Sequence, residues 1–119
     1  MKLQIGEVVS LHRYPVKSMA GQRLEFADVG WHGIEGDRRL ALHRVADRGG
    51  FPWLTASKLP ALVTFAPHGS SEAGSPGLPT HVRTPEGAEL TLFGNELAEE
   101  ISRRHGSRVE VMHLNRGIF

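Results

Sequence analysis

The sequence predicts a mainly β protein of the α+β class: about seven short strands in a small, barrel-like curled sheet, with one helix in the C-terminal half. Three observations predict this fold. Short runs rich in β-branched residues alternate with turns rich in Gly and Pro. Only one segment carries both the start and the stop signals of a helix. The 119 residues suffice for one hydrophobic core but not for two, so residues 1–119 are expected to form a single domain.

The expected strands are short and are separated by turn residues. The first ends near Pro15, which has no N–H to donate to a ladder. Residues 46–50 and 85–87 are expected to form hairpin turns. Residues 68–79, rich in Gly, Pro and Ser, are expected to form a mobile loop. In chain order, we expect strands at residues 5–12, 24–29, 38–45, 51–55, 62–65, 80–84, 89–93 and 109–111.

The predicted helix begins near residue 95. Asn95 can cap its N-terminus, while Leu97 and Ile101 share one face. Basic residues at 103–105 suit the negative end of the helix dipole, and Gly106 supplies the stop signal.

Charge and residue content exclude several classes of function. The 14 Lys and Arg nearly cancel the 13 Asp and Glu, so no overall field draws the chain to nucleic acid or to an anionic membrane. No apolar run is long enough to span a bilayer. The chain has no cysteine, which excludes disulfides, thiolate metal sites and cysteine nucleophiles and suits a cytoplasmic location.

One local anion site is expected after Pro15. Lys17 offers a point charge and Ser18 a hydroxyl donor, and the two together could hold one phosphate. The structural alternative is a solvated lysine in a turn, beside a serine that bonds its own backbone. The spacing by itself favours this alternative.

A second basic point lies at Asp37-Arg38-Arg39. On a strand, only one of the two arginines can share a face with the carboxylate of Asp37. The planar fork of an arginine suits a phosphate or the edge of a planar heterocycle. The alternative is an Asp–Arg pair that holds the turn, and the spacing does not decide between the two.

No other pattern typical of a catalytic or metal site is found. The seven histidines are scattered and are expected to be surface groups or hydrogen-bonded, half-buried groups. Trp31 and Trp53 are expected in the core or at its rim. No spacing of carboxylates supports a small hydrolase, which is the weakest alternative.

Three segments taken together resemble the N-terminal β-barrel region of the MOSC family. In order along the chain they are SLHRYPVKSMAGQRLEFADV, GIEGDRRLAL and FPWLTASKLPALV. The family is named after the C-terminal domain of molybdenum cofactor sulfurase and includes the mitochondrial amidoxime-reducing component. The resemblance runs from Ile5 to about Leu62 and resumes at the helix, the last strand and the terminal NRGIF.

The resemblance implies a site for the molybdenum cofactor, a pterin with a dithiolene and a terminal phosphate. In the family, the Lys and Ser of YPVKS and the Arg of GDR contact this cofactor. At the matching positions these cofactor-binding residues are Lys17, Ser18 and Arg38. Family members include molybdenum-dependent oxidoreductases and sulfur carriers, and pyridoxal phosphate binding is also ascribed to the family. Within this chain we expect no catalytic residue and no metal ligand.

The chain departs from the family pattern at the metal. Cofactor-binding members ligate molybdenum through a Cys of the later MOSC domain, and this chain has no Cys. We therefore expect a domain that contributes phosphate and pterin contacts, while redox or sulfur-transfer chemistry belongs to a C-terminal MOSC domain in cis or in trans. The alternative is a free-standing interaction module that has lost the cofactor. The terminal Ile118 and Phe119 are a further expected cause of self-association into a homo-oligomer.

Overall fold

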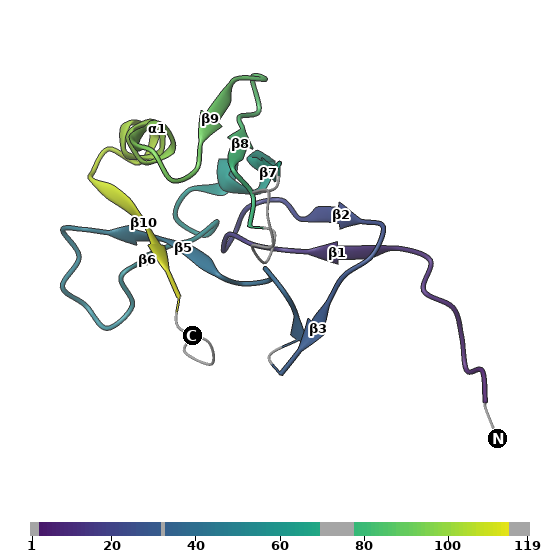
Figure 1. The fold of residues 1–119 in the computed structure, drawn as a ribbon. Helices are drawn as coiled ribbons and strands as arrows, with labels where there is room; N and C mark the ends of the chain where they lie inside the picture. The colour runs from purple at the N-terminus through teal and green to yellow at the C-terminus, as the bar shows by residue number, and fades with distance from the viewer. Residues whose placement is uncertain (1–2, 32, 70–77, 115–119) are drawn as a thin grey trace.

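The computed structural model describes residues 3–31, 33–69 and 78–114 and shows a mainly β fold with one α-helix (Figure 1). The helices are the 3-10 helix η1 (Pro60–Thr64) and α1 (Asn95–His105). The strands are β1 (Leu11–Arg13), β2 (Gln22–Leu24), β3 (Val29–Gly30), β4 (Gly33–Ile34), β5 (Leu40–Arg44), β6 (Trp53–Leu54), β7 (Ala66–His68), β8 (His81–Arg83), β9 (Glu89–Thr91) and β10 (Val109–His113).

The described strands form four small antiparallel sheets. Their orders are β1–β2, β3–β4, β10–β5–β6 and β7–β8–β9. No closed barrel is present in the described part of the chain, so the barrel-like arrangement expected from the sequence is not confirmed. The mainly β class with one helix is confirmed.

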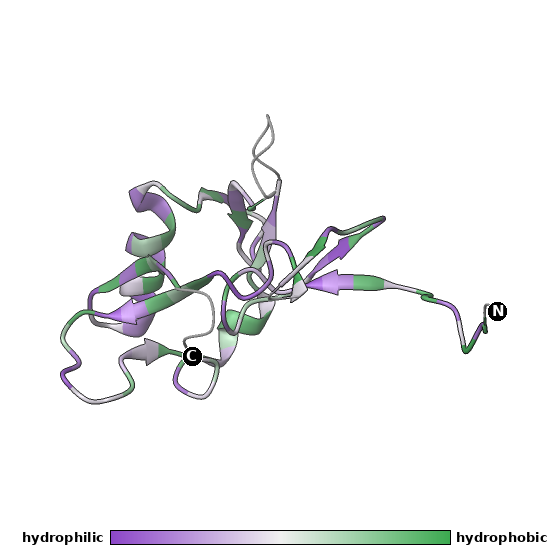
Figure 2. Ribbon diagram, turned by 60° about the horizontal axis from the view of Figure 1, so that its bottom comes forward, coloured by the Kyte–Doolittle hydropathy of each residue, from purple (hydrophilic) through white to green (hydrophobic). Residues whose placement is uncertain are grey.

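The core lies where the two three-stranded sheets and α1 meet. Leu97 and Ile101 of α1 are fully buried, and the helix packs against β9 and β10. Figure 2 shows hydrophobic and hydrophilic residues alternating around this helix, as expected for one buried face. The buried cluster comprises Val16, Met19, Leu40, Leu42, Leu54, Leu62, Phe65, Val82, Leu92, Leu97, Ile101 and Val109.

The strand predicted at residues 5–12 is wrong for most of its length. Only Leu11–Arg13 is a strand, and residues 3–10 form an exposed arm that leaves the body of the molecule (Figure 1). A β-rich run becomes a strand only beside a partner, and no described strand of this chain lies beside the arm. The strand predicted at 24–29 is likewise replaced by the ends of β2 and β3.

The strand predicted at residues 62–65 is also wrong, because residues 62–64 belong to η1 and Phe65 is its C-cap. Pro60 occupies its first turn, where the fixed φ of proline suits a helix and the missing N–H costs nothing. The hairpins β5–β6 and β8–β9 and the last strand β10 are confirmed. Residues 70–77 of the predicted loop and residues 118–119 lie outside the described residues, whereas His68 lies in β7.

The predicted helix is confirmed, but its predicted cap is not. The N-cap residue is Gly94, with no side-chain hydrogen bond, and Asn95 is the first helical residue. Gly106 ends the helix in the left-handed region at φ 84°, and its N–H donates to the carbonyl of Ser102 at 2.8 Å.

Two predictions about ring side chains are corrected. Trp31 is 99% exposed, so it belongs neither to the core nor to its rim. Trp53 is half-buried and meets His43 edge-on at 5.9 Å between ring centroids. The Nδ1 atom of His43 is buried without a hydrogen-bond partner. The expectation that the half-buried histidines are hydrogen-bonded is therefore wrong for this atom.

Candidate functional site

The structure brings the three predicted site residues around one pocket. This pocket has a volume of about 480 Å³ and is lined by Tyr14, Val16, Lys17, Ser18, Arg38 and Leu40. Lys17 and Ser18 follow β1, whereas Arg38 precedes β5, so the pocket joins two segments that are distant in sequence.

Backbone hydrogen bonds hold these two segments side by side. Val16 forms a parallel bridge with Leu40, and both side chains are fully buried. The Lys17 N–H donates to the carbonyl of Leu40 at 2.9 Å, and the Leu40 N–H donates to the carbonyl of Pro15 at 2.9 Å. The Arg38 N–H donates to the carbonyl of Tyr14 at 2.8 Å. The position of Arg38 relative to Lys17 is therefore set by main-chain bonds beneath the pocket.

Arg13 anchors the loop that leads to Arg38. Its side chain is buried, and its Nε donates to Oε1 of Gln22 at 3.0 Å. Its Nη1 donates to the carbonyl of Glu35 at 3.2 Å. Burial lowers the pKa of Arg13, while the nearby charge of Asp37 acts in the opposite direction. Arg13 therefore ties β1 and β2 to the turn that precedes the pocket.

Asp37 joins both sides of the pocket. Its Oδ1 accepts a hydrogen bond from the Tyr14 N–H at 2.6 Å, and its Oδ2 pairs with Nη1 of Arg38. The Asp–Arg pair considered as the structural alternative is thus present. The Arg38 side chain is 65% exposed, so this pair adds little stability, and the guanidinium carries further N–H donors.

The expectation that Asp37 and Arg38 lie on a strand, with alternating side chains, is wrong. Arg38 has φ 51°, in the left-handed region, and β5 begins only at Leu40. Strand alternation therefore does not apply at this point, which lets Asp37 and Arg38 pair although they are neighbours in sequence.

Ser18 does not bond its own backbone, contrary to the structural alternative. Its Oγ accepts a hydrogen bond from the N–H of Ala56 at 3.0 Å. A hydroxyl that accepts in this way still has its own proton to donate. Lys17 is half-buried, with its Nζ 5.9 Å from the centroid of the Phe51 ring.

Both Ser18 and Arg38 have unfavourable backbone conformations. Among the described residues they are the only non-glycine residues with positive φ, at 72° and 51°. A side chain in the left-handed region costs about 1–2 kcal/mol. Such strain is often retained at a functional site, where it fixes a side chain in a required position. Here both strained residues line the same pocket.

Sequence reasoning missed several residues of the site. Tyr14 and Leu40 form its walls, Asp37 joins its two sides, and Ala56 positions the hydroxyl of Ser18. Tyr14 and Asp37 adjoin the motifs that were singled out, so proximity in sequence was a usable signal. No signal pointed to Ala56, which lies 38 positions from Ser18.

Three further observations bear on other kinds of site in the described residues. No three His, Asp or Glu side chains in the described ranges are grouped so that they could hold a metal ion. No described helix has the length and apolar content needed to cross a bilayer. A larger hollow of about 770 Å³ lies between α1 and β10, but it contains none of the three predicted site residues.

Comparison with known proteins agrees with the resemblance in sequence. The family model of the MOSC N-terminal beta barrel domain matches residues 5–115. The chain belongs to this family. In this MOSC N-terminal domain, the matched region includes every residue that lines the pocket. No curated protein and no solved structure matches the chain.

Proposed function

We propose that the pocket between the end of β1 and the start of β5 binds the phosphate and pterin portion of the molybdenum cofactor. The observation that carries this proposal is that Lys17, Ser18 and Arg38 line one pocket. Two cationic groups and a hydroxyl with a proton to donate suit the oxygens of a phosphate. The guanidinium of Arg38 can also meet the polar edge of a planar heterocycle.

The residues of this chain fit the organic part of the cofactor and not its metal. Molybdenum bound to a protein favours a soft sulfur ligand, and the chain has no cysteine. When bound, the cofactor would supply the redox or sulfur-transfer chemistry, and this chain would orient it by its phosphate. A sulfur ligand would come from a C-terminal MOSC domain, in cis or in trans. A cytoplasmic location is part of the same proposal.

The first test is the change Lys17→Ala. Loss of one charge-assisted contact costs about 1.5–3 kcal/mol, which corresponds to roughly a tenfold to 150-fold weaker affinity. Titration calorimetry of the purified chain with metal-free molybdopterin measures this loss. Arg103→Ala is the matched control, because it removes one positive charge from the exposed face of α1, away from the pocket.

Equal binding by the parent chain and by Lys17→Ala would contradict the assignment. Absence of binding by the parent chain would favour the alternative function, an interaction module that keeps the fold without the cofactor. We also expect the chain by itself to reduce no N-hydroxylated substrate and to transfer no sulfur. Turnover by the purified chain with added cofactor would contradict this division of roles.

A further inference from the structure

The hollow of about 770 Å³ is a groove between α1 and β10. On the helix it is lined by Asn95, Ala98, Glu99 and Ser102, which share one face. On the other side it is lined by Arg108, which precedes β10, and by residues 109–111 and 113 of the strand. Residues 92–94, which lead into α1, complete the lining, and the Phe93 ring stacks on the His113 ring at 5.5 Å between centroids. Consecutive residues of one strand point alternately to opposite faces. A groove that touches consecutive residues therefore follows the edge of β10 and not only one face.

The edge of β10 that carries Val111 and His113 has no partner strand among those described. β10 is the outer strand of the sheet β10–β5–β6. The Val45 N–H donates to the carbonyl of Arg108, and the Leu114 N–H donates to the carbonyl of Arg39. Because bonding alternates along an antiparallel pair, residues 108, 110, 112 and 114 face β5, and residues 109, 111 and 113 face outward.

At Val109, the outward-facing main-chain groups of this edge contact the hydroxyl of Ser102. Its N–H donates to Oγ of Ser102 at 2.8 Å, and the one proton of that hydroxyl is shared between the carbonyl of Ala98 at 2.6 Å and that of Val109 at 3.3 Å. The next two outward residues, Val111 and His113, have no such partner within the described residues. Their main-chain groups form an exposed template for one more strand.

The N-terminal arm, residues 3–10, is exposed along its whole length and pairs with no described strand. Its side chains at Leu3, Ile5, Val8 and Val9 are 80–93% exposed. Glu7 is its only charged residue, so the arm can be buried at a small desolvation cost. Eight extended residues span about 26 Å, enough to run the whole length of the five-residue strand β10.

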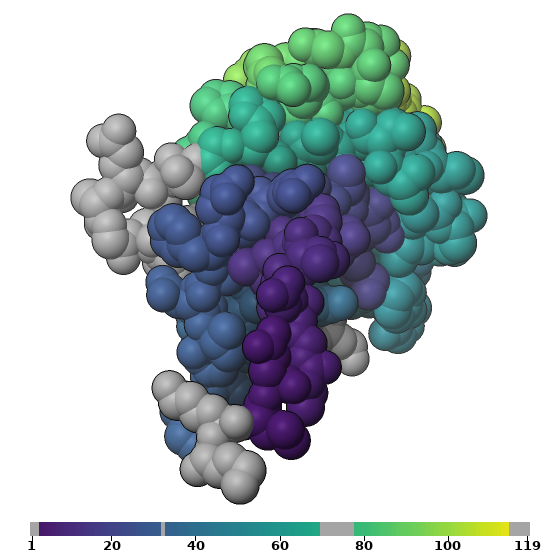
Figure 3. All heavy atoms as spheres, turned by 90° about the vertical axis from the view of Figure 1, so that its right-hand side faces the viewer, coloured from purple at the N-terminus to yellow at the C-terminus, as the bar shows by residue number. Residues whose placement is uncertain are grey.

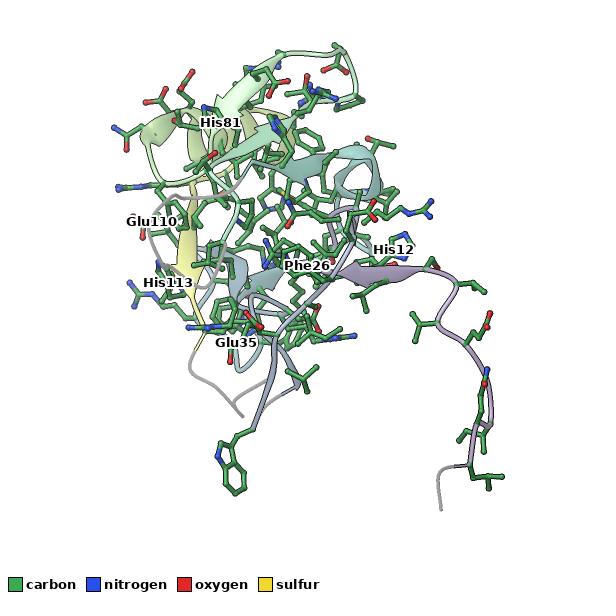
Figure 4. The ribbon with its side chains drawn as sticks, turned by 45° about the vertical axis from the view of Figure 1, so that its right-hand side comes forward. His12, Phe26, Glu35, His81, Glu110 and His113 are labelled. Carbon is green, nitrogen blue, oxygen red and sulfur yellow. The ribbon has the colours of Figure 1, made fainter. Side chains whose placement is uncertain are left out.

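The arm and the groove lie on different sides of the molecule. In Figure 1 the arm leaves on the side away from α1 and β10, and in Figure 4 the labelled Glu110 and His113 lie on the side opposite the arm. In Figure 3, viewed toward the arm, the purple arm lies in front, and the green to yellow segments that include α1 and β10 lie at the top and behind. In this structure the arm therefore does not lie beside the groove of its own chain.

We propose that residues 3–10 of one copy add as a strand to β10 of a second copy, in the groove beside α1. The N–H and carbonyl groups of Val111 and His113 supply the main-chain hydrogen bonds. Apolar side chains of the arm pack against the helix face that carries Ala98. This is strand addition at an open sheet edge, in which main-chain bonds give affinity and alternate side chains give selectivity.

The test is the molar mass of the purified chain, measured by light scattering after gel filtration over a range of concentrations. We expect the mass to rise above the 13.1 kDa of one chain as the concentration increases. The double change Ile5→Asp and Val8→Asp should leave a monomer. The matched control is Phe26→Asp with Val29→Asp, at side chains that are 84% and 76% exposed outside the arm, and it should assemble as the parent does.

Two changes in the groove test the other half of the contact. Val111→Pro removes an N–H that β5 does not use, and proline is tolerated at an outward-facing edge position. Ala98→Arg fills the groove while leaving the sequence of β10 unchanged, and it serves where the proline variant fails to fold. Both should abolish assembly.

A mixing experiment distinguishes this contact from nonspecific aggregation. The Ile5→Asp, Val8→Asp chain keeps its groove, and the Ala98→Arg chain keeps its arm. Each should be a monomer alone, and the mixture should form a one-to-one complex. A parent chain that stays monomeric at all concentrations would overturn the proposal. The proposal would also be overturned if the Ile5→Asp, Val8→Asp variant still assembled, or if the mixture of the two variants formed no complex.

Discussion

Ser18 and Arg38 show how single residues shape the candidate site. Each adopts a left-handed backbone conformation that glycine would adopt without strain. In each case the strained conformation turns a polar side chain toward the same pocket. Main-chain bonds from Tyr14 and Leu40 to the neighbouring segment hold the backbone in place, so the surrounding structure offsets the strain.

We predict that Arg38→Gly is more stable than Arg38→Ala by about 1 kcal/mol, because only the alanine retains the left-handed strain. Both variants lose the exposed pair with Asp37, so this contact cancels in the comparison. Urea denaturation of the two variants measures the difference. An alanine variant as stable as the glycine variant would show that the backbone at this position is not strained.

At the scale of the element, α1 contacts the core through Arg104 as well as through its buried apolar face. Arg104 pairs with Glu86 and with Glu100, and its guanidinium lies 4.9 Å from the centroid of the buried Phe65 ring. The hydrogen bond from Arg104 lowers the pKa of Glu86. Those from Arg103 and Arg104 lower the pKa of Glu100. The contact with Phe65 distinguishes Arg104 from Arg103, which is 70% exposed.

Arg104→Ala should therefore destabilise the fold more than Arg103→Ala does. We expect a loss of about 1–2 kcal/mol for Arg104, through its packing and cation–π contact with Phe65. For Arg103, an exposed pair with Glu100, we expect no more than about 0.5 kcal/mol. Chemical denaturation of both variants gives the two values, and equal losses would contradict the role assigned to Phe65.

At the scale of the whole molecule, the chain is more extended than its length requires. The radius of gyration is 15.7 Å, against about 13.5 Å for a compact chain of this length. Part of the excess comes from the arm, which projects from the body (Figure 1). Exposed Phe26, Val29 and Trp31 add apolar surface outside the core. Such surface is typical of proteins that bind a partner.

Removal of residues 1–9 should leave the thermal midpoint of unfolding unchanged in dilute solution, because the described part of the arm adds nothing to the buried core. The radius of gyration from small-angle X-ray scattering should fall. Phe65→Ala is the positive control, since loss of this fully buried ring should cost about 3–5 kcal/mol. A lower midpoint after truncation would mean that the arm stabilises the fold within one chain.

Sequence patterns predicted the structure correctly where that structure depends on residues adjacent in the sequence. Gly106 stops α1, and the hairpins around residues 46–50 and 85–87 form as expected, because caps and turns depend on a few adjacent residues. Expectations failed where a distant partner was required. Residues 5–10 have strand composition but no described strand beside them, and residues 62–64 follow Pro60 into a 3-10 helix.

The sequence by itself determined the family, the mainly β class and the identity of Lys17, Ser18 and Arg38 as site candidates. These follow from residue type and order alone. Only the tertiary structure decided that the three side chains share one pocket, that Ala56 holds Ser18, and that the edge of β10 lies beside a groove. The physical reason is that each of these features joins segments tens of residues apart, and main-chain hydrogen bonds between such segments form only once the core has packed.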